Sequence, residues 1–246
     1  MKNNTQGLPS PFVPAANSPA ARIEPQIPDY LQKVYWWAYL HPNAVRLFER
    51  EWLVNLILWG NFSRLRDGAL AELGDPIEHR LLQVACVYGD FSQRLAARLG
   101  AAGRLDVVDV APIQLANLRR KLADDTRIQL HRQDASALHF ADASFDASLL
   151  FFLLHEQPEA VRRATLAEAL RVTRPGGKIV IVDYHKPKRC NPLRYVMKAV
   201  LGMLEPFADD LWRQEIASYL PASISPGNIS KRTCFGDLYQ QVVITV

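Results

Sequence analysis

Short apolar runs that end in polar residues recur along the second two thirds of the chain. They predict buried strands at 81–87, 104–109, 128–132, 145–154 and 178–182, and a closing antiparallel hairpin at 234–239 and 240–246. Segments 112–122 and 158–172 have the spacing of helices and lie between the strands. Strands that alternate with helices are typical of an open α/β sheet that is wound on both faces.

Three other segments flank or interrupt this pattern. Residues 1–28 are rich in Pro, Ala, Asn and Ser and predict a flexible tail. Residues 29–75 predict an aromatic-rich helical lid, with one helix over 29–41 and a second, capped by Asn43, that runs to Trp59. The lid either packs on the sheet, or also covers an apolar substrate and touches a bilayer interface. The remaining domain, 76–246, contains a helical insertion at 191–220, which either packs on the sheet edge or forms another wall of a substrate cavity.

Composition narrows the class of protein. Hydrophobic residues make up 49% of the 246 residues, and 29 basic against 25 acidic residues give a mild net charge of +4. The chain has no block of like charges, which disfavours nucleic-acid binding. It has three widely spaced cysteines, no spanning apolar run and no secretion signal, so we expect a cytoplasmic protein in a reducing compartment.

Candidate chemistry gathers where the strands end. The first strand breaks at Gly89 and continues into a helix, and Asp109 ends the second strand twenty residues later. An acid at this distance is placed to hold ribose hydroxyls. Asp134 follows the third strand, where it either accepts a hydrogen bond from an adenine amino group or caps a turn. No nucleophile, base and acid have motif spacing, which disfavours a hydrolase.

The first strand and its loop resemble those of class I S-adenosylmethionine (SAM) methyltransferases, whose motif is acidic-x-Gly-x-Gly-x-Gly. Here Gln83 replaces the acid, Ala85 and Val87 replace two glycines, and Gly89 remains. The Pro-Gly-Gly turn at 175–177 also fits this family. The resemblance implies a Rossmann-like, seven-stranded, mostly parallel sheet with an N-terminal helical lid. The alternative is a core strand and turn that no longer bind a cofactor.

The Tyr-Trp-Trp-Ala-Tyr run at 35–39 and the Ala-Cys-Val-Tyr-Gly-Asp-Phe loop at 85–91 are similar to the rhodoquinone biosynthesis enzymes. This resemblance implies replacement of a methoxy group of ubiquinone by an amino group, with SAM as the amino donor and with manganese dependence. The aromatic lid and the apolar substrate expected here predict peripheral association with the inner face of the membrane. The neutral Gln83 fits this chemistry, because a nearby carboxylate would favour the charged form of an amine that must attack as a neutral group.

The expected site residues follow from these placements. We expect the chemistry to involve Gln83, Tyr88 and His155. We expect the cofactor to be bound by Gln83, Ala85, Tyr88, Gly89, Asp90, Asp109, Val110, Asp134, Ala135 and Phe151. We expect the substrate to contact Tyr35, Trp36, Tyr39 and Tyr184. Two imidazoles and two carboxylates at the ends of neighbouring strands could hold Mn²⁺, or could form a hydrogen-bonded rim without a metal: His155, Glu156, Asp183 and His185.

Two alternative functions stay open. A conventional SAM-dependent methyltransferase that acts on a quinone or small aromatic would tolerate the altered loop. A non-catalytic SAM-binding protein would bind the cofactor without turnover. The sequence does not determine the oligomeric state.

Overall fold

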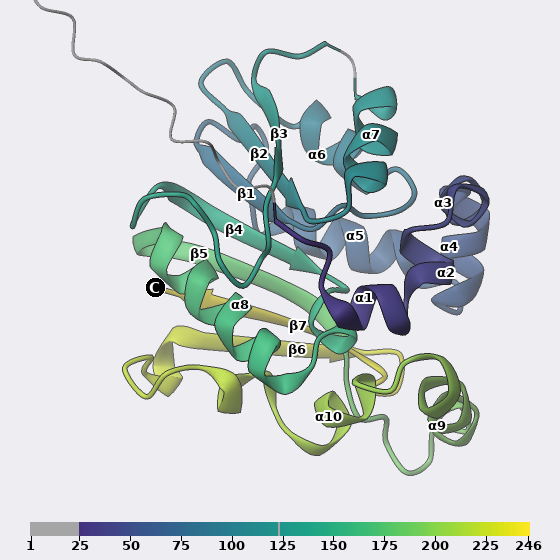
Figure 1. Cartoon of the computed structure of the whole chain (residues 1–246). Helices are drawn as coiled ribbons and strands as arrows, with labels where there is room; N and C mark the ends of the chain where they lie inside the picture. Colours follow the sequence, from purple (N-terminus) through teal and green to yellow (C-terminus); the bar gives the residue numbers. More distant parts are fainter. Residues whose placement is uncertain (1–24, 123) are drawn as a thin grey trace, which may run out of the picture.

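The computed structural model describes residues 25–122 and 124–246, and its centre is a seven-stranded sheet (Figure 1). The strand order is β3-β2-β1-β4-β5-β7-β6. The strands are β1 (Arg80–Val84), β2 (Arg104–Asp109), β3 (Ile128–Arg132), β4 (Phe145–Phe151), β5 (Thr173–Tyr184), β6 (Ile229–Cys234) and β7 (Tyr239–Thr245). Strands β1 to β5 pair in parallel, and β7 pairs antiparallel with both β5 and β6. The predicted fold, a mostly parallel seven-stranded sheet, is confirmed.

Helices cover both faces of the sheet. Helices α5 (Phe62–Ala71), α6 (Phe91–Ala97) and α7 (Pro112–Lys121) share one core, and α8 (Glu159–Val172) packs into the core on the other face (Figure 1). Successive strand residues point to opposite faces, so Leu81 belongs to the first core and Leu82 to the second. Among the described residues, no helix combines the length and apolar character needed to cross a membrane.

The N-terminal segment is more divided than the sequence predicts. It forms α1 (Asp29–Lys33), α2 (Trp36–Tyr39), α3 (Pro42–Phe48) and α4 (Glu51–Ile57), where two longer helices were expected. The expected cap is also wrong: His41 precedes α3 and its Nδ1 accepts from the backbone N–H of Asn43 at 3.3 Å. Pro42 takes the first helical position, where a missing N–H costs nothing. Residues 25–28 belong to no helix or strand, and the rest of the predicted tail lies outside the described residues.

The C-terminal part corrects one further prediction. The insertion forms α9 (Leu193–Leu204), α10 (Ala208–Arg213) and a 3₁₀ turn, η2 (Ile216–Tyr219). The hairpin strands are 229–234 and 239–245, so the segment 234–239, expected to be a strand, is mostly the turn. Phe235, Gly236 and Asp237 all have positive φ, which an extended strand does not allow.

Candidate cofactor and substrate site

Two cavities meet at the carboxyl ends of the parallel strands, where open α/β sheets bind ligands. The strand-end cavity lies against the loop after β1 and the ends of β2 and β4, and is lined by Tyr30, Leu31, Tyr39, Ala85–Tyr88, Val108–Ala111, Gln114, Gln133–Ala135, Phe151–Leu153, Glu156 and Gln157. The apolar cavity, about 550 Å³, lies between the N-terminal helices and α9. It is lined by Trp37–Tyr39, Leu47, Phe48, Leu53, Val54, Leu56–Trp59, Tyr88, Phe152, His155, Tyr184, Met197, Val200, Leu201, Leu204 and Glu205. Tyr39, Tyr88 and Phe152 line both cavities, so the two are neighbours.

The loop after β1 turns through two left-handed residues. Ala85 has φ 68° and Gly89 has φ 76°. A Cβ on Gly89 would come within 3.1 Å of the Phe62 ring, which explains why glycine stands there. Ala85 holds a backbone conformation in which an L side chain is strained. It lines the strand-end cavity, so its methyl group narrows the space at the place where the resembled motif has glycine.

Gln83 is placed differently from the prediction. Its side chain is fully buried beneath the loop and does not line the strand-end cavity. Nε2 donates to the carbonyl of Ala85 at 3.0 Å, and Oε1 accepts from Ser92 Oγ at 3.0 Å. Gln83 therefore holds the loop against α6 instead of contacting a ligand directly.

Two of the carboxylates predicted to bind the cofactor line the strand-end cavity. Asp109 Oδ2 accepts from the backbone N–H of Cys86 at 2.8 Å, and its Oδ1 accepts from that of Ala111 at 2.8 Å. Burial raises the pKa of Asp109, although these backbone N–H groups oppose the shift. Asp134 closes a turn by accepting from the N–H and hydroxyl of Ser136, at 2.8 and 2.7 Å, and also lines the cavity. The turn role is shown, and a contact with adenine stays a prediction.

Tyr88 forms the wall between the cavities. Its ring stacks on Tyr39, with centroids 5.8 Å apart and planes 6° apart. Its hydroxyl donates to the carbonyl of Ala38 at 2.7 Å and accepts from Gln114 Nε2 at 2.7 Å. Burial raises the pKa of Tyr88 well above its ordinary value. A hydroxyl held in this way positions the lid, and it is not free to transfer a proton.

A buried acid and imidazole stand where the two cavities meet. The turn η1 (Leu154–Glu156) follows β4, and Asp183 lies near the end of β5 beside it. Asp183 Oδ1 lies 2.9 Å from His155 Nδ1, and Oδ2 accepts from the backbone N–H of Leu154 at 2.9 Å. Burial lowers the pKa of His155, but the charge and hydrogen bond of Asp183 outweigh it and raise this pKa to about 9. At neutral pH the ring is therefore an imidazolium, whose Nδ1 donates to Asp183.

Two further carboxyl groups approach this imidazolium. Glu156 Oε1 lies 3.8 Å from His155 Nε2 and accepts a hydrogen bond from the hydroxyl of Tyr39. Burial raises the pKa of Glu156 to about 8, while the charge of His155 opposes the rise. Glu205, at the end of α9, has its pKa raised by burial, and its Oε2 has no hydrogen-bond partner among the described residues. The junction thus carries one imidazolium and several groups able to exchange protons.

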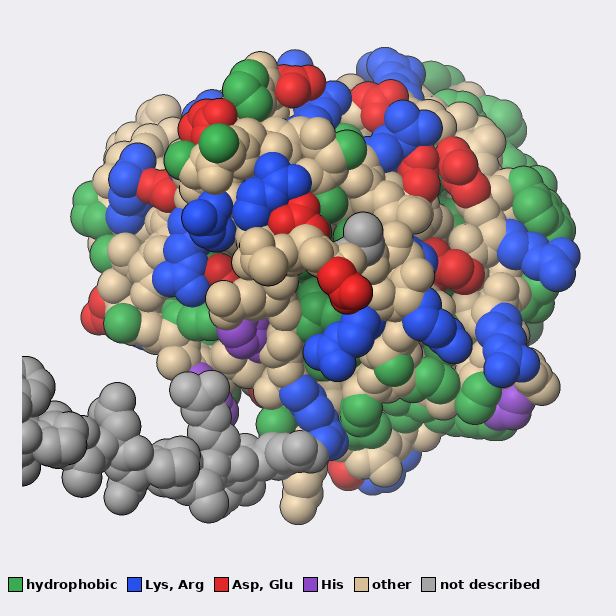
Figure 2. All heavy atoms as spheres, turned by 90° about the horizontal axis from the view of Figure 1, so that it is seen from above, with side chains coloured by type: hydrophobic (Ala, Val, Ile, Leu, Met, Phe, Trp, Pro, Cys, Tyr) green, Lys and Arg blue, Asp and Glu red, His purple; other side chains and the backbone are tan. Residues whose placement is uncertain are grey.

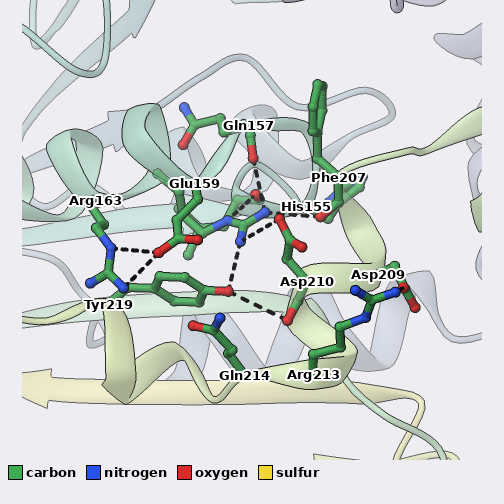
Figure 3. Close-up of polar contacts among 12 residues, drawn as sticks. His155, Gln157, Glu159, Arg163, Phe207, Asp209, Asp210, Arg213, Gln214 and Tyr219 are labelled. Carbon is green, nitrogen blue, oxygen red and sulfur yellow. Dashed lines mark hydrogen bonds and ion pairs between the residues drawn. The ribbon is translucent and has the colours of Figure 1, made fainter.

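Arg162 holds this turn to the insertion. Its fully buried guanidinium donates to three carbonyls: Leu154 at 2.9 Å, Gln157 at 2.9 Å and Phe207 at 3.0 Å. It also donates to the hydroxyl of Tyr219 at 2.9 Å. Figure 3 shows this region, with His155, Gln157, Phe207 and Tyr219 around one guanidinium. Because these partners come from η1, η2 and the segment between α9 and α10, Arg162 fixes the junction between them.

The residues proposed for manganese do not form a ligand set. Asp183 is occupied by the backbone of η1 and by His155. The Nδ1 of His185 lies 2.8 Å from the carbonyl of Asp237, and its Nε2 lies 2.9 Å from Lys231 Nζ, away from the other three. Within residues 25–122 and 124–246, no group of three or more His, Cys, Asp or Glu side chains is arranged to hold a metal ion. The geometry of these four residues therefore does not fit a manganese ion.

Four other predicted contacts lie outside the cavities. Asp90 pairs with Arg66 at 2.6 Å and with Arg94, and Gly89 packs on Phe62. Tyr35 is fully buried beside Phe207, and Trp36 is half exposed. The apolar cavity is lined instead by the neighbouring Trp37 and by Tyr39 and Tyr184. The other residues predicted to bind the cofactor do line the strand-end cavity, namely Ala85, Tyr88, Asp109, Val110, Asp134, Ala135 and Phe151.

Glu205 is the most informative residue that the sequence prediction missed. It is the single acid in a mostly apolar stretch, 195–207, directly before Pro206. A lone carboxylate in such a stretch is a signal of function, because an unpaired buried charge is costly. Gln114, Gln133 and Gln157 were also missed, because a neutral amide, whether in a helix as Gln114 is or in a loop, carries no such signal.

Comparison with known proteins shows a likeness to methyltransferases over part of the chain. Residues 81–177 match the family described as a methyltransferase domain. The segment that is similar to this family makes up less than half of the chain. The crystal structure of a SAM-dependent methyltransferase from Aquifex aeolicus has the same fold, with a TM-score of 0.53 and 18% identity over 84% of this chain and 99% of that chain. The N-methyltransferase NodS from Bradyrhizobium japonicum WM9 superposes with a TM-score of 0.51 and 15% identity, over 74% of this chain and 83% of that chain.

Among curated proteins, similar sequences are named as quinone methyltransferases. A demethylmenaquinone methyltransferase of Staphylococcus saprophyticus is 31% identical over 58% of this chain and 63% of its own length. The ubiquinone/menaquinone biosynthesis C-methyltransferase UbiE of Ectopseudomonas mendocina is 30% identical over 57% of this chain and 55% of its own length. This chain spans less than two thirds of the length of these relatives.

Proposed function

We propose that the protein is a SAM-dependent transferase that modifies the ring of an isoprenoid quinone. The observation that carries the proposal is the pair of adjoining cavities, with carboxylates for a nucleoside in one and an apolar chamber in the other. The apolar cavity falls within the usual size range of small-molecule sites, ≈ 300–1,000 Å³. The names of the quinone-modifying relatives support the same substrate class.

Within this class we propose that the amino nitrogen of SAM replaces a methoxy group of ubiquinone. The nitrogen bonds to the ring carbon and the methoxy group leaves as methanol. Loss of the Cα proton, with two electrons passing to the quinone, then gives an imine of the quinol, and water hydrolyses this imine to an α-keto acid and the reduced form of rhodoquinone. The support is the altered loop. A buried neutral Gln83 places no carboxylate at the end of β1, and Ala85 narrows the path along the loop. An amine attacks a quinone only in its neutral form, so the absence of a carboxylate at this point removes a bias toward the ammonium.

Methyl transfer to a quinone is the second candidate, and the comparisons favour it over amino transfer. The similar curated sequences are named as methyltransferases, and two of them as methyltransferases of menaquinone and ubiquinone biosynthesis. The same two cavities would serve that reaction. The candidates differ only in which atom of SAM faces the apolar cavity.

The residues take distinct parts in either reaction. SAM would supply the transferred group, with Asp109 accepting from ribose hydroxyls and Asp134 from the adenine amino group. The quinone ring would lie in the apolar cavity against Tyr39 and Tyr184. The His155 imidazolium lines that cavity; in amino transfer it would donate to a quinone carbonyl and stabilise the negative charge that develops on the oxygen when the amine adds to the ring. Asp183 keeps the ring oriented and charged.

The test uses SAM labelled either at the methyl carbon or at the amino nitrogen, with a short-chain ubiquinone as acceptor. Mass spectrometry of the product should show the labelled nitrogen and loss of the methoxy group. Labelled methyl carbon in the product would contradict amino transfer and support the second candidate. If calorimetry shows that SAM binds while no product forms, either with or without added manganese, that result would support a non-catalytic SAM-binding protein.

We also propose that the protein acts as a cytoplasmic protein at the membrane surface. An isoprenoid quinone stays in the bilayer, so the enzyme has to meet its substrate there. The exposed aromatic side chains of the N-terminal helices support such a contact.

A further inference from the structure

The mouth of the apolar cavity is ringed by exposed apolar side chains from two separate segments. On the α3–α4 side, Leu47, Leu56, Ile57 and Trp59 are 40–65% exposed and line the cavity. On the α9 side, Leu204 is 39% exposed and also lines it. The indole Nε1 of Trp59 donates to Met197 Sδ at 3.2 Å, which joins the two segments at the rim. The mouth is therefore an apolar surface that water covers in the isolated chain.

The apolar surface continues beyond the mouth. Trp52 on α4 is 60% exposed, and Met203 and Tyr195 on α9 are 77% and 70% exposed, although none of the three lines the cavity. Figure 1 places α4 and α9 on the same side of the molecule, and Figure 2 shows hydrophobic side chains gathered at the same edge, interspersed with basic ones. Helix α9 thus buries one face against the cavity and leaves a second apolar face outside. Exposed apolar patches of this kind mark interaction sites.

A basic cluster borders this surface. A hollow beside α9 is lined by five basic side chains and one acid: Lys186, Arg189, Arg194, Lys198, Arg213 and Asp209. Asp209 pairs with Arg213 at 2.5 Å. The lining of the hollow, as far as the structure describes the chain, contains four more basic residues and no second acid. Arg194 and Lys198 lie one turn apart on α9 itself, next to Tyr195. Positive charge beside an exposed apolar helix face suits an anionic lipid surface.

We propose that the α9 face and the exposed side of α4 form a docking surface for an anionic phospholipid bilayer. The apolar side chains enter the headgroup boundary, and the basic cluster contacts lipid phosphates. Docking in this orientation opens the apolar cavity to the bilayer, so the ring of a quinone can enter while its isoprenoid tail stays in lipid. This purpose rests on the proposed quinone substrate, but the docking itself does not.

The test is co-sedimentation of the full chain with vesicles of phosphatidylcholine alone, or with one third phosphatidylglycerol. We expect binding to the anionic vesicles that falls as salt rises, and little binding to the neutral ones. The double variant Arg194→Gln/Lys198→Gln should bind anionic vesicles roughly 25-fold more weakly, at about fivefold for each basic side chain near the surface. The double variant Trp52→Ser/Met203→Ser should also bind more weakly. The control Arg119→Gln/Lys178→Gln removes two exposed cations elsewhere and should bind like the natural chain.

Several outcomes would overturn the proposal. The chain could remain in the supernatant with anionic vesicles at low salt, or the Arg119/Lys178 control could lose as much binding as the α9 variant. A stable dimer in light scattering that the Trp52/Met203 variant abolishes, without vesicle binding, would assign the surface to a second copy of the chain. Turnover of a water-soluble short-chain quinone, measured without vesicles, reports on the proposed function separately. The Arg194/Lys198 variant should keep it.

Discussion

Replacing Arg162 by methionine should destabilise the folded chain by about 3–5 kcal/mol. The guanidinium is fully buried, and methionine fills most of its length without supplying any donor. The carbonyls of Leu154, Gln157 and Phe207 would each lose a partner. A buried acceptor left without a hydrogen bond costs about 1–3 kcal/mol, and partial relaxation of three such groups gives the stated range.

The neighbouring Arg163 provides the matched control, and Figure 3 shows it on the outer side of the same network. It pairs with Glu159 at 2.8 Å, and both side chains are nearly half exposed, at 44% and 46%. An exposed pair of this kind contributes about 0–1 kcal/mol, so Arg163→Met should change stability only slightly. The two substitutions remove the same side chain from adjacent positions of one helix.

Chemical denaturation of both variants and the natural chain gives the free energies of unfolding. The reasoning is refuted if Arg162→Met costs less than about 1 kcal/mol, or if Arg163→Met costs as much. A second readout follows the turn itself. Since Arg162 holds η1, the variant should also show faster hydrogen exchange at 154–157 than in β4, under conditions where the chain is still folded.

Three further predictions concern the junction and the loop. Gln83→Glu would place a buried carboxylate against the carbonyl of Ala85, so we expect a loss of roughly 2–4 kcal/mol of stability, measured by denaturation, with Gln83→Met as the uncharged control. Burial raises the pKa of Glu156 from 4.5 to about 8. Between these pH values the folded chain keeps a proton on Glu156 that the unfolded chain has released. The contribution of Glu156 to the free energy of unfolding therefore falls as pH rises from 4.5 to 8. Glu156→Gln should remove that fall, so the Tm of the variant should rise relative to that of the natural chain as pH increases. If the difference in Tm between the two chains stays the same from pH 4.5 to 8, the raised pKa of Glu156 is contradicted. His155→Gln should lower kcat about 10²-fold or more with little change in SAM affinity by calorimetry, whereas weakened SAM binding alone would contradict its place at the quinone.

The strands were the most predictable part of the chain. The bounds predicted for β2 and β3 are those of the structure, because the apolar residues of each strand (Leu105, Val107 and Val108; Ile128 and Leu130) have polar residues on both sides. The hairpin failed for the opposite reason. Strand β6 is an edge strand whose residues are mostly exposed, so Lys231 and Arg232 gave it a polar character that resembles a loop. The more apolar Phe235 was assigned to a strand instead, although it lies in the turn.

The site was predictable in position but not in orientation. The carboxyl ends of parallel strands lie at one edge of the sheet, so the positions of Asp109, Asp134 and His155 near these ends predicted that they lie in the same region. The topology does not say whether a side chain at a strand end faces the ligand or the protein. Gln83 turns inward because Ser92 and the carbonyl of Ala85 satisfy its amide there. The sequence marks Glu205 as a lone acid in an apolar stretch, but its place beside η1 was beyond prediction, because the path of the insertion depends on Arg162 contacts formed only in the folded chain.

The distribution of buried acids bears on which atom of SAM would react in the proposed transfer. The resembled motif keeps an acid at the end of the first strand, and here that position is a neutral amide engaged with the loop. Acidic groups lie instead across the strand-end cavity at Glu156, and beyond it at Glu205 in the apolar cavity. Because its raised pKa keeps Glu156 protonated at neutral pH, beside the His155 imidazolium, neither Glu156 nor Gln83 supplies a negative charge that would favour the ammonium form of an amine. In methyl transfer the amine has no part in the bond that forms, so a displaced acid would bring no advantage. The measured fate of the amino nitrogen therefore tests this arrangement of charge directly.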